Sequence, residues 1–280
     1  MTDRYVSFDG SIVALHQHFT YSTIWNSQAQ DTWSSKQTIV TTTDVAGNTS
    51  FTTTYTYTPV NGPSVPDLPF QVDNQLPVES SIVTTDSTGK VLRTVNKTWS
   101  DQYLLTNEQT MFDNGLTANT GYKHGPGAVV TEKDEYDFGQ GVPVARQTKT
   151  AYTPFSSTQY GAILDKPSTI QVYDRGVLVN ETDYSYDMSP VSPVSPAPLA
   201  HDEMFYSGSS LRARGNNTKT TRKCFLSGGS ACPDSVSRTT YDETGQPTQI
   251  QDASGNVTQY SYADNYTSDN GSPSGIPTHI

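Results

Sequence analysis

The 280-residue sequence contains few apolar and few charged residues. Hydrophobic residues make up 33% of the chain and charged residues 16%, and both fractions are below those of an average globular domain. The low apolar fraction argues against a dense core, and the low charge excludes the charge-rich type of disorder. No stretch approaches the roughly 20 apolar residues of a membrane-spanning helix, so no membrane span is predicted.

Basic residues are scarce as well. The chain has 17 Lys and Arg against 28 Asp and Glu, which gives a net charge of −11. Binding to a phosphate backbone requires a basic surface, and nucleic acid is therefore excluded as an expected partner. Residues 1–10 lack a basic segment followed by an apolar run, so no signal peptide is predicted. Residues 272–280 contain no closing element, and we expect the chain to be part of a longer polypeptide.

Polar and aromatic residues that favour strands fill the sequence instead. Thr, Ser, Asn and Gln are abundant, and the chain contains 17 Tyr. β-branched and aromatic side chains fit a pleated, half-solvated surface, and the composition therefore predicts an all-β fold. No amphipathic helix of more than three turns is recognisable, although residues 199–206 are the best place for a short one.

The clearest local pattern lies in residues 239–262, which are predicted to form three strands joined by two tight turns. Asp242 and Gly245 bracket the first turn, and Asp252 and Gly255 bracket the second. An Asp at the first position caps the backbone with its carboxylate, and the Gly adopts a positive φ that a tight hairpin needs. We therefore expect Gly245 or its neighbour to lie at positive φ.

The same turn pattern recurs upstream, each time between strands rich in Thr, Tyr and Val. Its spacing is irregular, so insertions are expected. The further turns are predicted at Asp44–Gly47, Asp86–Gly89, Met111–Leu116, Glu135–Gly141 and Asp174–Gly176.

Two proline-rich stretches divide the chain, because proline is unsuited to a central strand. The predicted organisation is a β-hairpin region at 1–58, a linker or long loop at 59–77, a hairpin array at 78–188, a Pro/Ser-rich linker at 189–210, a repeat unit at 211–264 and a loop-like tail at 265–280.

The repeat unit resembles the YD repeat of the bacterial Rhs family. The resemblance is carried by eight residues at fixed spacing, with weaker similarity in residues 91–99, 164–187 and 214–224. The eight residues are Tyr241, Asp242, Gly245, Asp252, Gly255, Asn256, Tyr260 and Tyr262.

This resemblance implies antiparallel β-hairpins joined edge to edge into a long curved or spiralling sheet. In the family such sheets form shells around a C-terminal toxin, or extended surface structures. The family's C-terminal core motif and toxin domain are not in this sequence. The implied function is a non-catalytic structural segment of an extracellular or cell-surface protein. Its partners would be the remaining repeats of a longer chain or a neighbouring subunit.

Residues capable of chemistry are few, and each group has a simpler interpretation. His16 and His18 would share a strand face and could hold a metal, but no third ligand stands at suitable spacing. The acidic residues between Glu132 and Asp137, which include Asp134 and Glu135, lack the ligand pattern of a known calcium loop. A solvated strand edge is the favoured interpretation. No catalytic, cofactor-binding or metal-binding residue is predicted, and we do not expect an enzyme.

Two further features leave alternatives open. Trp25, Trp33 and Trp99 could stack on sugar rings, which would make the chain a carbohydrate- or cell-surface-binding module, although cross-strand packing is favoured. Cys224 and Cys232 flank a short Gly- and Ser-containing loop. They are either two unrelated thiols or a disulfide, and a disulfide would require an oxidising compartment.

Overall fold

The computed structural model confirms the all-β prediction: strands dominate and helix is almost absent. The only helical element in the described part of the chain is one 3-10 turn, η1 (Pro126–Ala128). The structure describes residues 2–26, 32–61, 75–139, 141–153, 155–157, 161–194, 213–225 and 232–262.

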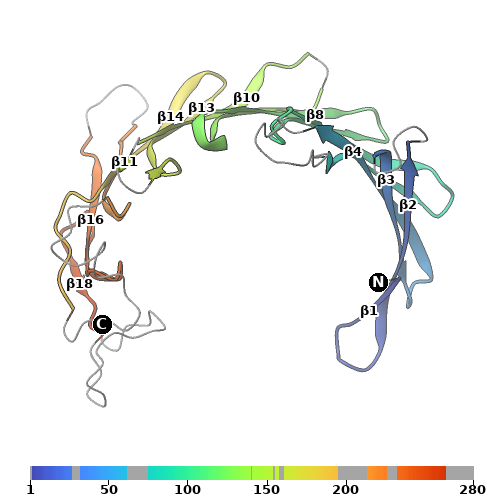
Figure 1. Cartoon of the computed structure of the whole chain (residues 1–280), viewed down its shortest axis with the longest axis horizontal. Coiled ribbons are helices and arrows are strands. Elements are labelled where there is room, and N and C mark those ends of the chain that lie inside the picture. Colours follow the sequence, from blue (N-terminus) through green and yellow to red (C-terminus); the bar gives the residue numbers. More distant parts are fainter. Residues whose placement is uncertain are drawn as a thin grey trace, which may run out of the picture. The chain divides into compact units, whose positions relative to one another are not determined.

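The strands follow one another along the chain, mostly as hairpins (Figure 1). They are β1 (Asp3–Ser7), β2 (Val13–Trp25), β3 (Trp33–Asp44), β4 (Thr49–Asn61), β5 (Gln75–Asp86), β6 (Val91–Trp99), β7 (Leu105–Phe112), β8 (Thr117–His124), β9 (Val130–Tyr136), β10 (Val144–Tyr152), β11 (Phe155–Ser157), β12 (Gly161–Ile163), β13 (Pro167–Asp174), β14 (Val177–Tyr186), β15 (Asn217–Arg222), β16 (Ser235–Tyr241), β17 (Pro247–Gln251) and β18 (Val257–Gln259).

The strand order is the order of the sequence. Sixteen strands belong to one sheet in the order β1 to β10 and then β13 to β18, and β11 and β12 form a separate small hairpin. The pairings from β1 to β8 and from β13 to β18 are antiparallel. The chain divides into two compact units, residues 1–124 with 132–147, and residues 125–131 with 148–280.

The first unit is a single layer of strands. Its described residues include no helix and no second sheet that would cover either face. β-branched and aromatic residues lie opposite one another across the ladders, as in the row Phe19, Val40 and Thr53. Such cross-strand pairs contribute about 0.2–1 kcal/mol each, so the sheet depends on many small lateral contacts.

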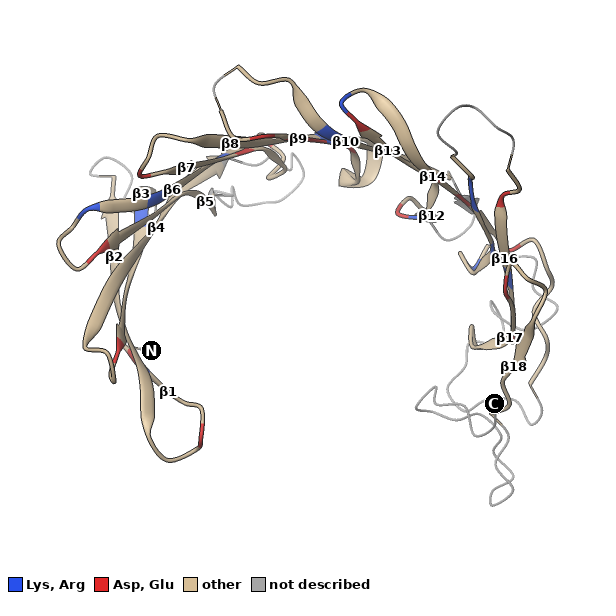
Figure 2. Ribbon diagram, turned by 180° about the vertical axis from the view of Figure 1, so that it is seen from behind, with Lys and Arg blue, Asp and Glu red and all other residues tan. Residues whose placement is uncertain are grey.

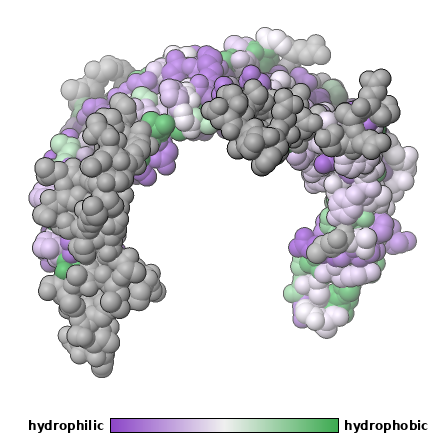
Figure 3. Space-filling model, in the orientation of Figure 1, coloured by the Kyte–Doolittle hydropathy of each residue, from purple (hydrophilic) through white to green (hydrophobic). Residues whose placement is uncertain are grey.

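Burial is correspondingly shallow. Among the described residues, no side chain is less than 2% exposed, and the buried apolar residues are Trp33, Val40, Val78 and Val95. Polar and apolar side chains are interspersed on the surface seen in Figure 3. The low apolar fraction of the sequence thus corresponds to a sheet without a thick core.

The second unit contains the hairpin pairs β13–β14, β15–β16 and β17–β18. β13 and β14 are joined by a two-residue turn in which Arg175 and Gly176 lie at φ of 45° and 83°. Positive φ at both positions is the requirement of a type I′ hairpin. The shorter turn predicted at Asp174–Gly176 is therefore confirmed.

The proline-rich linker predicted at 59–77 is shorter than expected at both ends. Pro59 lies opposite Pro77 in the pairing of β4 with β5. Proline weakens a ladder only where its missing N–H would face a partner. The ladder of β4 with β3 reaches Tyr57, and the ladder of β5 with β6 reaches Ser81. Both prolines lie beyond these points, which is why strands accept them. The middle of the segment lies outside the described residues.

The second linker, 189–210, also differs from the prediction at its start. Ser192 forms a parallel bridge with Asp242, so this segment runs beside the repeat unit instead of merely connecting to it. The short helix expected at 199–206 and the tail at 265–280 lie outside the described residues. No helix in the described part of the chain has the length and apolar character needed to cross a membrane.

Candidate functional site

The predicted turn at Asp242 is a three-residue hairpin loop closed by backbone and carboxylate together. The Asp242 N–H donates to the Gln246 carbonyl at 2.9 Å, and the Gly245 N–H donates to the Asp242 carbonyl at 3.1 Å. Asp242 Oδ1 accepts from the Thr244 N–H at 2.9 Å, the Thr244 hydroxyl at 2.6 Å and the Gln246 N–H at 3.0 Å. Gly245 lies at φ 86°, as the sequence predicts, so the capping carboxylate and the left-handed glycine both belong to the turn.

The turn at Asp252 repeats this arrangement. Asp252 Oδ1 accepts from the N–H groups of Ser254 at 2.9 Å and Asn256 at 2.8 Å, and Asp252 Oδ2 accepts from the Asn256 side-chain amide at 2.8 Å. Gly255 lies at φ 88°. The Asn256 side chain, followed by the backbone bonds, holds the pKa of Asp252 below its usual value. Asn256 therefore acts as a second cap.

Asp86 forms a third copy of the same turn. Its Oδ1 accepts from the Thr88 N–H at 2.8 Å, the Thr88 hydroxyl at 2.6 Å and the Lys90 N–H at 3.0 Å, with Gly89 at φ 86°. Acidic residues stand at several hairpin tips in Figure 2. The predicted turn at Asp44 differs, because Asn48 at φ 47° takes the left-handed position instead of Gly47.

Sequence reasoning missed two turns with the same backbone bonds. In the first, the Ser100 N–H bonds the Leu104 carbonyl and the Tyr103 N–H bonds the Ser100 carbonyl, with Tyr103 at φ 60°. In the second, Gly125 pairs with Val129 in the same way. Neither carries the Asp and Gly signature. A hydroxyl cap at Ser100 was the one usable signal, since its Oγ accepts from the Leu104 N–H at 3.3 Å.

A second recurrent feature joins the two strands of a hairpin. A tyrosine hydroxyl at or just beyond the end of the second strand donates to a backbone carbonyl at the start of the first. The four pairs are Tyr152 to Val130 at 2.9 Å, Tyr186 to Pro167 at 2.8 Å, Tyr241 to Asn217 at 2.9 Å and Tyr262 to Pro247 at 3.0 Å. We call these bonds the tyrosine locks.

Trp99 makes the equivalent bond in the first unit. Its indole N–H donates to the Glu79 carbonyl at 2.8 Å, from the end of β6 to the interior of β5. Burial raises the pKa of each locking tyrosine, and raises that of Tyr186 to about 12. The hydroxyls therefore stay protonated and donate throughout the ordinary pH range.

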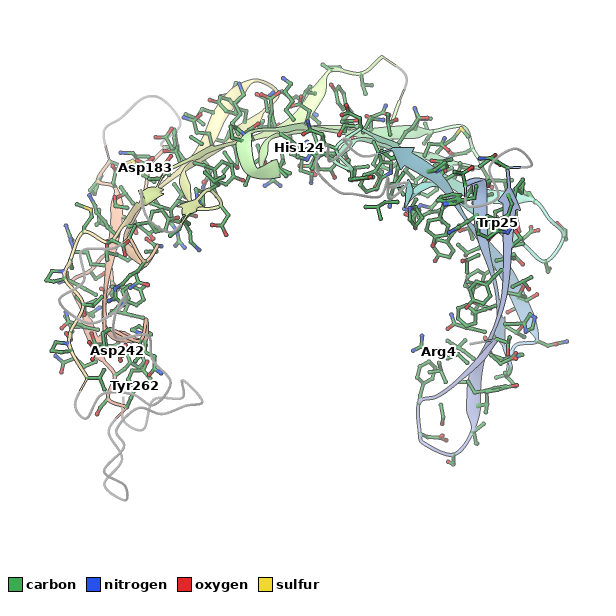
Figure 4. The ribbon with its side chains drawn as sticks, viewed as in Figure 1. Arg4, Trp25, His124, Asp183, Asp242 and Tyr262 are labelled. Carbon is green, nitrogen blue, oxygen red and sulfur yellow. A yellow bond between two sulfur atoms is a disulfide. The ribbon has the colours of Figure 1, made fainter. Side chains whose placement is uncertain are left out.

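The turn at Asp242 is also the most deeply buried polar region described. Asp242 and Glu243 are each 5% exposed, and Asp242 lies near Tyr262 (Figure 4). Glu243 Oε1 accepts from the Val194 N–H at 2.6 Å, and the Glu243 carbonyl accepts from Arg214 Nη1 at 2.7 Å. Both acids are thus engaged in holding the backbone of this region.

Asp187 anchors the segment that leads into the repeat unit. Its carboxylate accepts from the N–H groups of Arg214 at 2.8 Å, Gly215 at 2.8 Å and Asn216 at 3.0 Å. Asp187 itself lies at φ 52°, a strained position that three bonds to one carboxylate offset. This anchor connects residues far apart in sequence, so no local pattern predicted it.

The structure joins Cys224 and Cys232 in a disulfide, with their Cα atoms 5.7 Å apart. Next to it, the Asp234 carboxylate accepts from the Cys224 N–H at 3.1 Å and lies 3.2 Å from Lys223 Nζ. Of the two alternatives left open by the sequence, the disulfide is the one found. Its position beside β15 and β16 closes the connection between these strands.

The histidine pair lies in β2, next to the edge strand β1. His16 Nε2 and His18 Nδ1 lie 2.9 and 3.0 Å from the same oxygen of Asp3, and the His16 ring stacks on Tyr5 with centroids 4.6 Å apart. The hydrogen bonds to His18 and His16 lower the pKa of Asp3 to about 2. Both rings thus pair with a carboxylate, and no cluster able to hold a metal ion occurs within the described ranges.

The acidic stretch of β9 is paired residue by residue. Glu132 binds Lys123, Asp134 accepts from the Gln147 amide at 2.7 Å, and Glu135 lies 2.7 Å from Lys133 Nζ. Asp137 caps the neighbouring Phe138 N–H at 3.2 Å. These separate contacts do not converge on one point, so the described geometry offers no calcium site here.

The three tryptophans do not form one stacking platform. Trp33 is 4% exposed, with Lys36 Nζ 4.4 Å from its ring centroid, while Trp25 is 57% exposed. Trp25 and Trp33 are cross-strand partners in β2 and β3, and Trp99 is engaged in its bond to Glu79. Trp33 and Trp99 are therefore engaged within the sheet, whereas the Trp25 side chain is largely exposed.

Each residue that carries the resemblance to the YD repeat has a place in this geometry. Asp242, Gly245, Asp252, Gly255 and Asn256 build the two turns. Tyr241 and Tyr262 are locks, and the Tyr260 N–H donates to the Thr248 carbonyl at 3.0 Å. The arrangement holds neighbouring strands of the repeat unit together.

Comparison with known proteins adds little. No protein-family model matches the chain, and no curated protein matches it. Among solved structures, the chain is similar to a porin-like protein from Bacteroides uniformis, with 14% identity and a TM-score of 0.31 over 89% of this chain and 85% of the other. A similarity this low assigns neither fold nor function.

Proposed function

We propose that this chain is a non-catalytic wall segment of a larger extracellular or cell-surface β-sheet assembly of the YD-repeat type. The observation that carries the proposal is the recurrence along the sheet of two devices, the Asp-capped turn and the aromatic lock, which occur together in the hairpins β5–β6 and β17–β18. The lock occurs as Trp99, Tyr152, Tyr186, Tyr241 and Tyr262 in five hairpins. Repetition of one structural unit along a sheet favours an extended scaffold.

The distribution of polar groups also supports a structural role. The buried acids Asp242 and Glu243 are engaged by backbone N–H groups. Groups that serve catalysis are instead positioned toward a cleft where a substrate can reach them. A chain whose buried polar groups stabilise its own turns is suited to holding shape.

The strand edges offer the means of assembly. Among the described residues, β1 pairs only with β2 and β18 only with β17. An unpaired edge presents N–H and C=O groups that pair with another strand. The partner would be a further repeat of a longer chain or a neighbouring subunit.

One residue of β1 allows the edge to be tested alone. The Phe19 N–H donates to the Thr2 carbonyl, and bonded pairs alternate along an antiparallel ladder. Tyr5 is therefore in a non-bonded position whose N–H points away from β2. Tyr5→Pro removes this outward N–H, and Tyr5→Ala removes the same ring while keeping the N–H.

Size-exclusion chromatography with light scattering measures the assembly. We expect the 280-residue chain to form species larger than a monomer as concentration rises, with Tyr5→Pro reducing them more than Tyr5→Ala. A wild-type chain that stays monomeric at every concentration contradicts the proposal. Equal behaviour of the two variants contradicts pairing through β1.

A further inference from the structure

We propose that one face of the sheet from β3 to β8 binds an uncharged polysaccharide. The face is defined by a row of amide and hydroxyl side chains, one from each strand. The row consists of Gln37, Thr56, Ser81, Asn96, Gln109 and Asn119. We call it the amide row, and the proposal does not depend on the assembly proposed above.

The strand register places these six residues in line. Successive members are direct cross-strand partners in every ladder from β3 to β8. Neighbouring strands lie about 4.8 Å apart, so the row offers one polar side chain at each strand spacing. An extended polysaccharide lying across the strands would present its hydroxyl groups at a comparable interval.

Charge is segregated between the two faces of these strands. Lys36, Arg93, Lys97 and Glu108 alternate with members of the amide row and therefore point to the opposite face. Over the residues that pair with one another from β3 to β8, the amide-row face has no charged side chain. Further along β8 on this face, Lys123 is paired with Glu132. In a chain of net charge −11, an uncharged surface around the amide row favours a neutral partner.

The amides of the row are unused within the described part of the protein. No hydrogen bond there engages the side chains of Gln37, Asn96, Gln109 or Asn119, and all four are at least partly exposed. Elsewhere in the sheet, in contrast, the Gln147 amide is bonded to Asp134. A free amide offers both donors and an acceptor, which suits the hydroxyl groups of a sugar.

The neighbouring row on the same face supplies apolar contact. Ile39, Val83 and Met111 alternate there with threonines across the strands. Sugar rings combine hydroxyl edges with C–H faces, so an amide row beside an aliphatic row matches both. Anionic polymers would be disfavoured by the net charge of the chain.

The test is retention of the 280-residue chain on insoluble cellulose, chitin and β-1,3-glucan, with soluble alginate as the charged comparison. The variant Asn96→Asp/Gln109→Glu places two charges in the row with nearly unchanged shape. Glu108→Gln changes a charge on the opposite face of the same strand. Melting temperatures establish that all three proteins are folded.

We expect the wild-type chain to be retained on at least one neutral polysaccharide. The double variant should lower binding about tenfold, the effect of losing one or two hydrogen bonds, while Glu108→Gln binds as the wild type does. The proposal is overturned if no neutral polysaccharide retains the chain, if alginate binds better, or if Glu108→Gln loses as much. It is also overturned if the double variant no longer self-associates but is still retained on the polysaccharide as the wild type is. Tyr5→Pro tests the wall segment separately.

Discussion

At the scale of single residues, the recurring device is one side chain that fixes a turn. Asp86, Asp242 and Asp252 each satisfy backbone N–H groups that the turn leaves without a strand partner. The sequence predicted these turns because the Asp and Gly requirements are local. It did not predict the turn at Tyr103, where a tyrosine adopts the left-handed conformation, because no glycine marks that turn in the sequence.

The glycine of the turn gives a direct stability prediction. Gly245→Val should lower the free energy of unfolding by about 1–2 kcal/mol, because a β-branched residue is strained at φ 86°. A Cβ there would lie 3.9 Å from the nearest Asn216 atom, so the cost is conformational. Urea denaturation measures it. Gly121→Ala, at ordinary φ in β8, is the control, and equal effects of the two changes would contradict the explanation.

Asp3 gives a prediction for acid conditions. Its pKa is lowered from 3.8 to about 2 by hydrogen bonds to His18 and His16. A lowered folded-state pKa means that the ionised form stabilises the fold above pH 3.8, and that this contribution is lost as the pH falls toward 2. The melting temperature of the wild type should therefore exceed that of Asp3→Asn at pH 5, and the difference should shrink by pH 2. A difference independent of pH would contradict this role.

At the scale of elements, the hairpins β5–β6 and β17–β18 are each held by an Asp-capped turn at one end and by a lock further along the strands. Composition and turn spacing predicted the strands and most of the turns. The locks could not be predicted, because a tyrosine and its carbonyl meet only once the register is fixed. Pro59 and Pro77 show the same limit, since a proline's tolerance depends on how far the neighbouring strands reach.

The lock between β13 and β14 can be removed by deleting one oxygen. Tyr186→Phe loses the bond to the Pro167 carbonyl and leaves that acceptor in a part-buried site, which should cost about 1 kcal/mol. Tyr184→Phe changes a tyrosine two residues away in the same strand and should have little effect. Thermal denaturation of both variants decides the point, and a similar loss in both would show that the bond to Pro167 contributes nothing specific.

At the scale of the molecule, the arrangement of contacts is nearly one-dimensional. Strands contact the strands next to them in sequence, and the buried apolar residues are few. In such an array, the free energy of unfolding is approximately the sum of the stabilities of the individual repeats and of the interfaces between neighbouring repeats. In a protein with a shared core, a destabilising substitution lowers the stability of the whole fold. In an array, it lowers stability mainly in the strands near the substituted residue.

This difference can be measured by hydrogen exchange in Gly245→Val. The strained turn weakens the pairing of β16 with β17, so amides in β16, β17 and β18 should exchange about 5- to 30-fold faster, the factor equivalent to 1–2 kcal/mol. Amides in β2 to β5, many ladders away along the strand order, should exchange at wild-type rates. Acceleration of the same size in both regions would mean that the chain unfolds as one cooperative unit. The comparison therefore distinguishes an array of hairpins from a single cooperative domain, whatever the absolute stability of the protein.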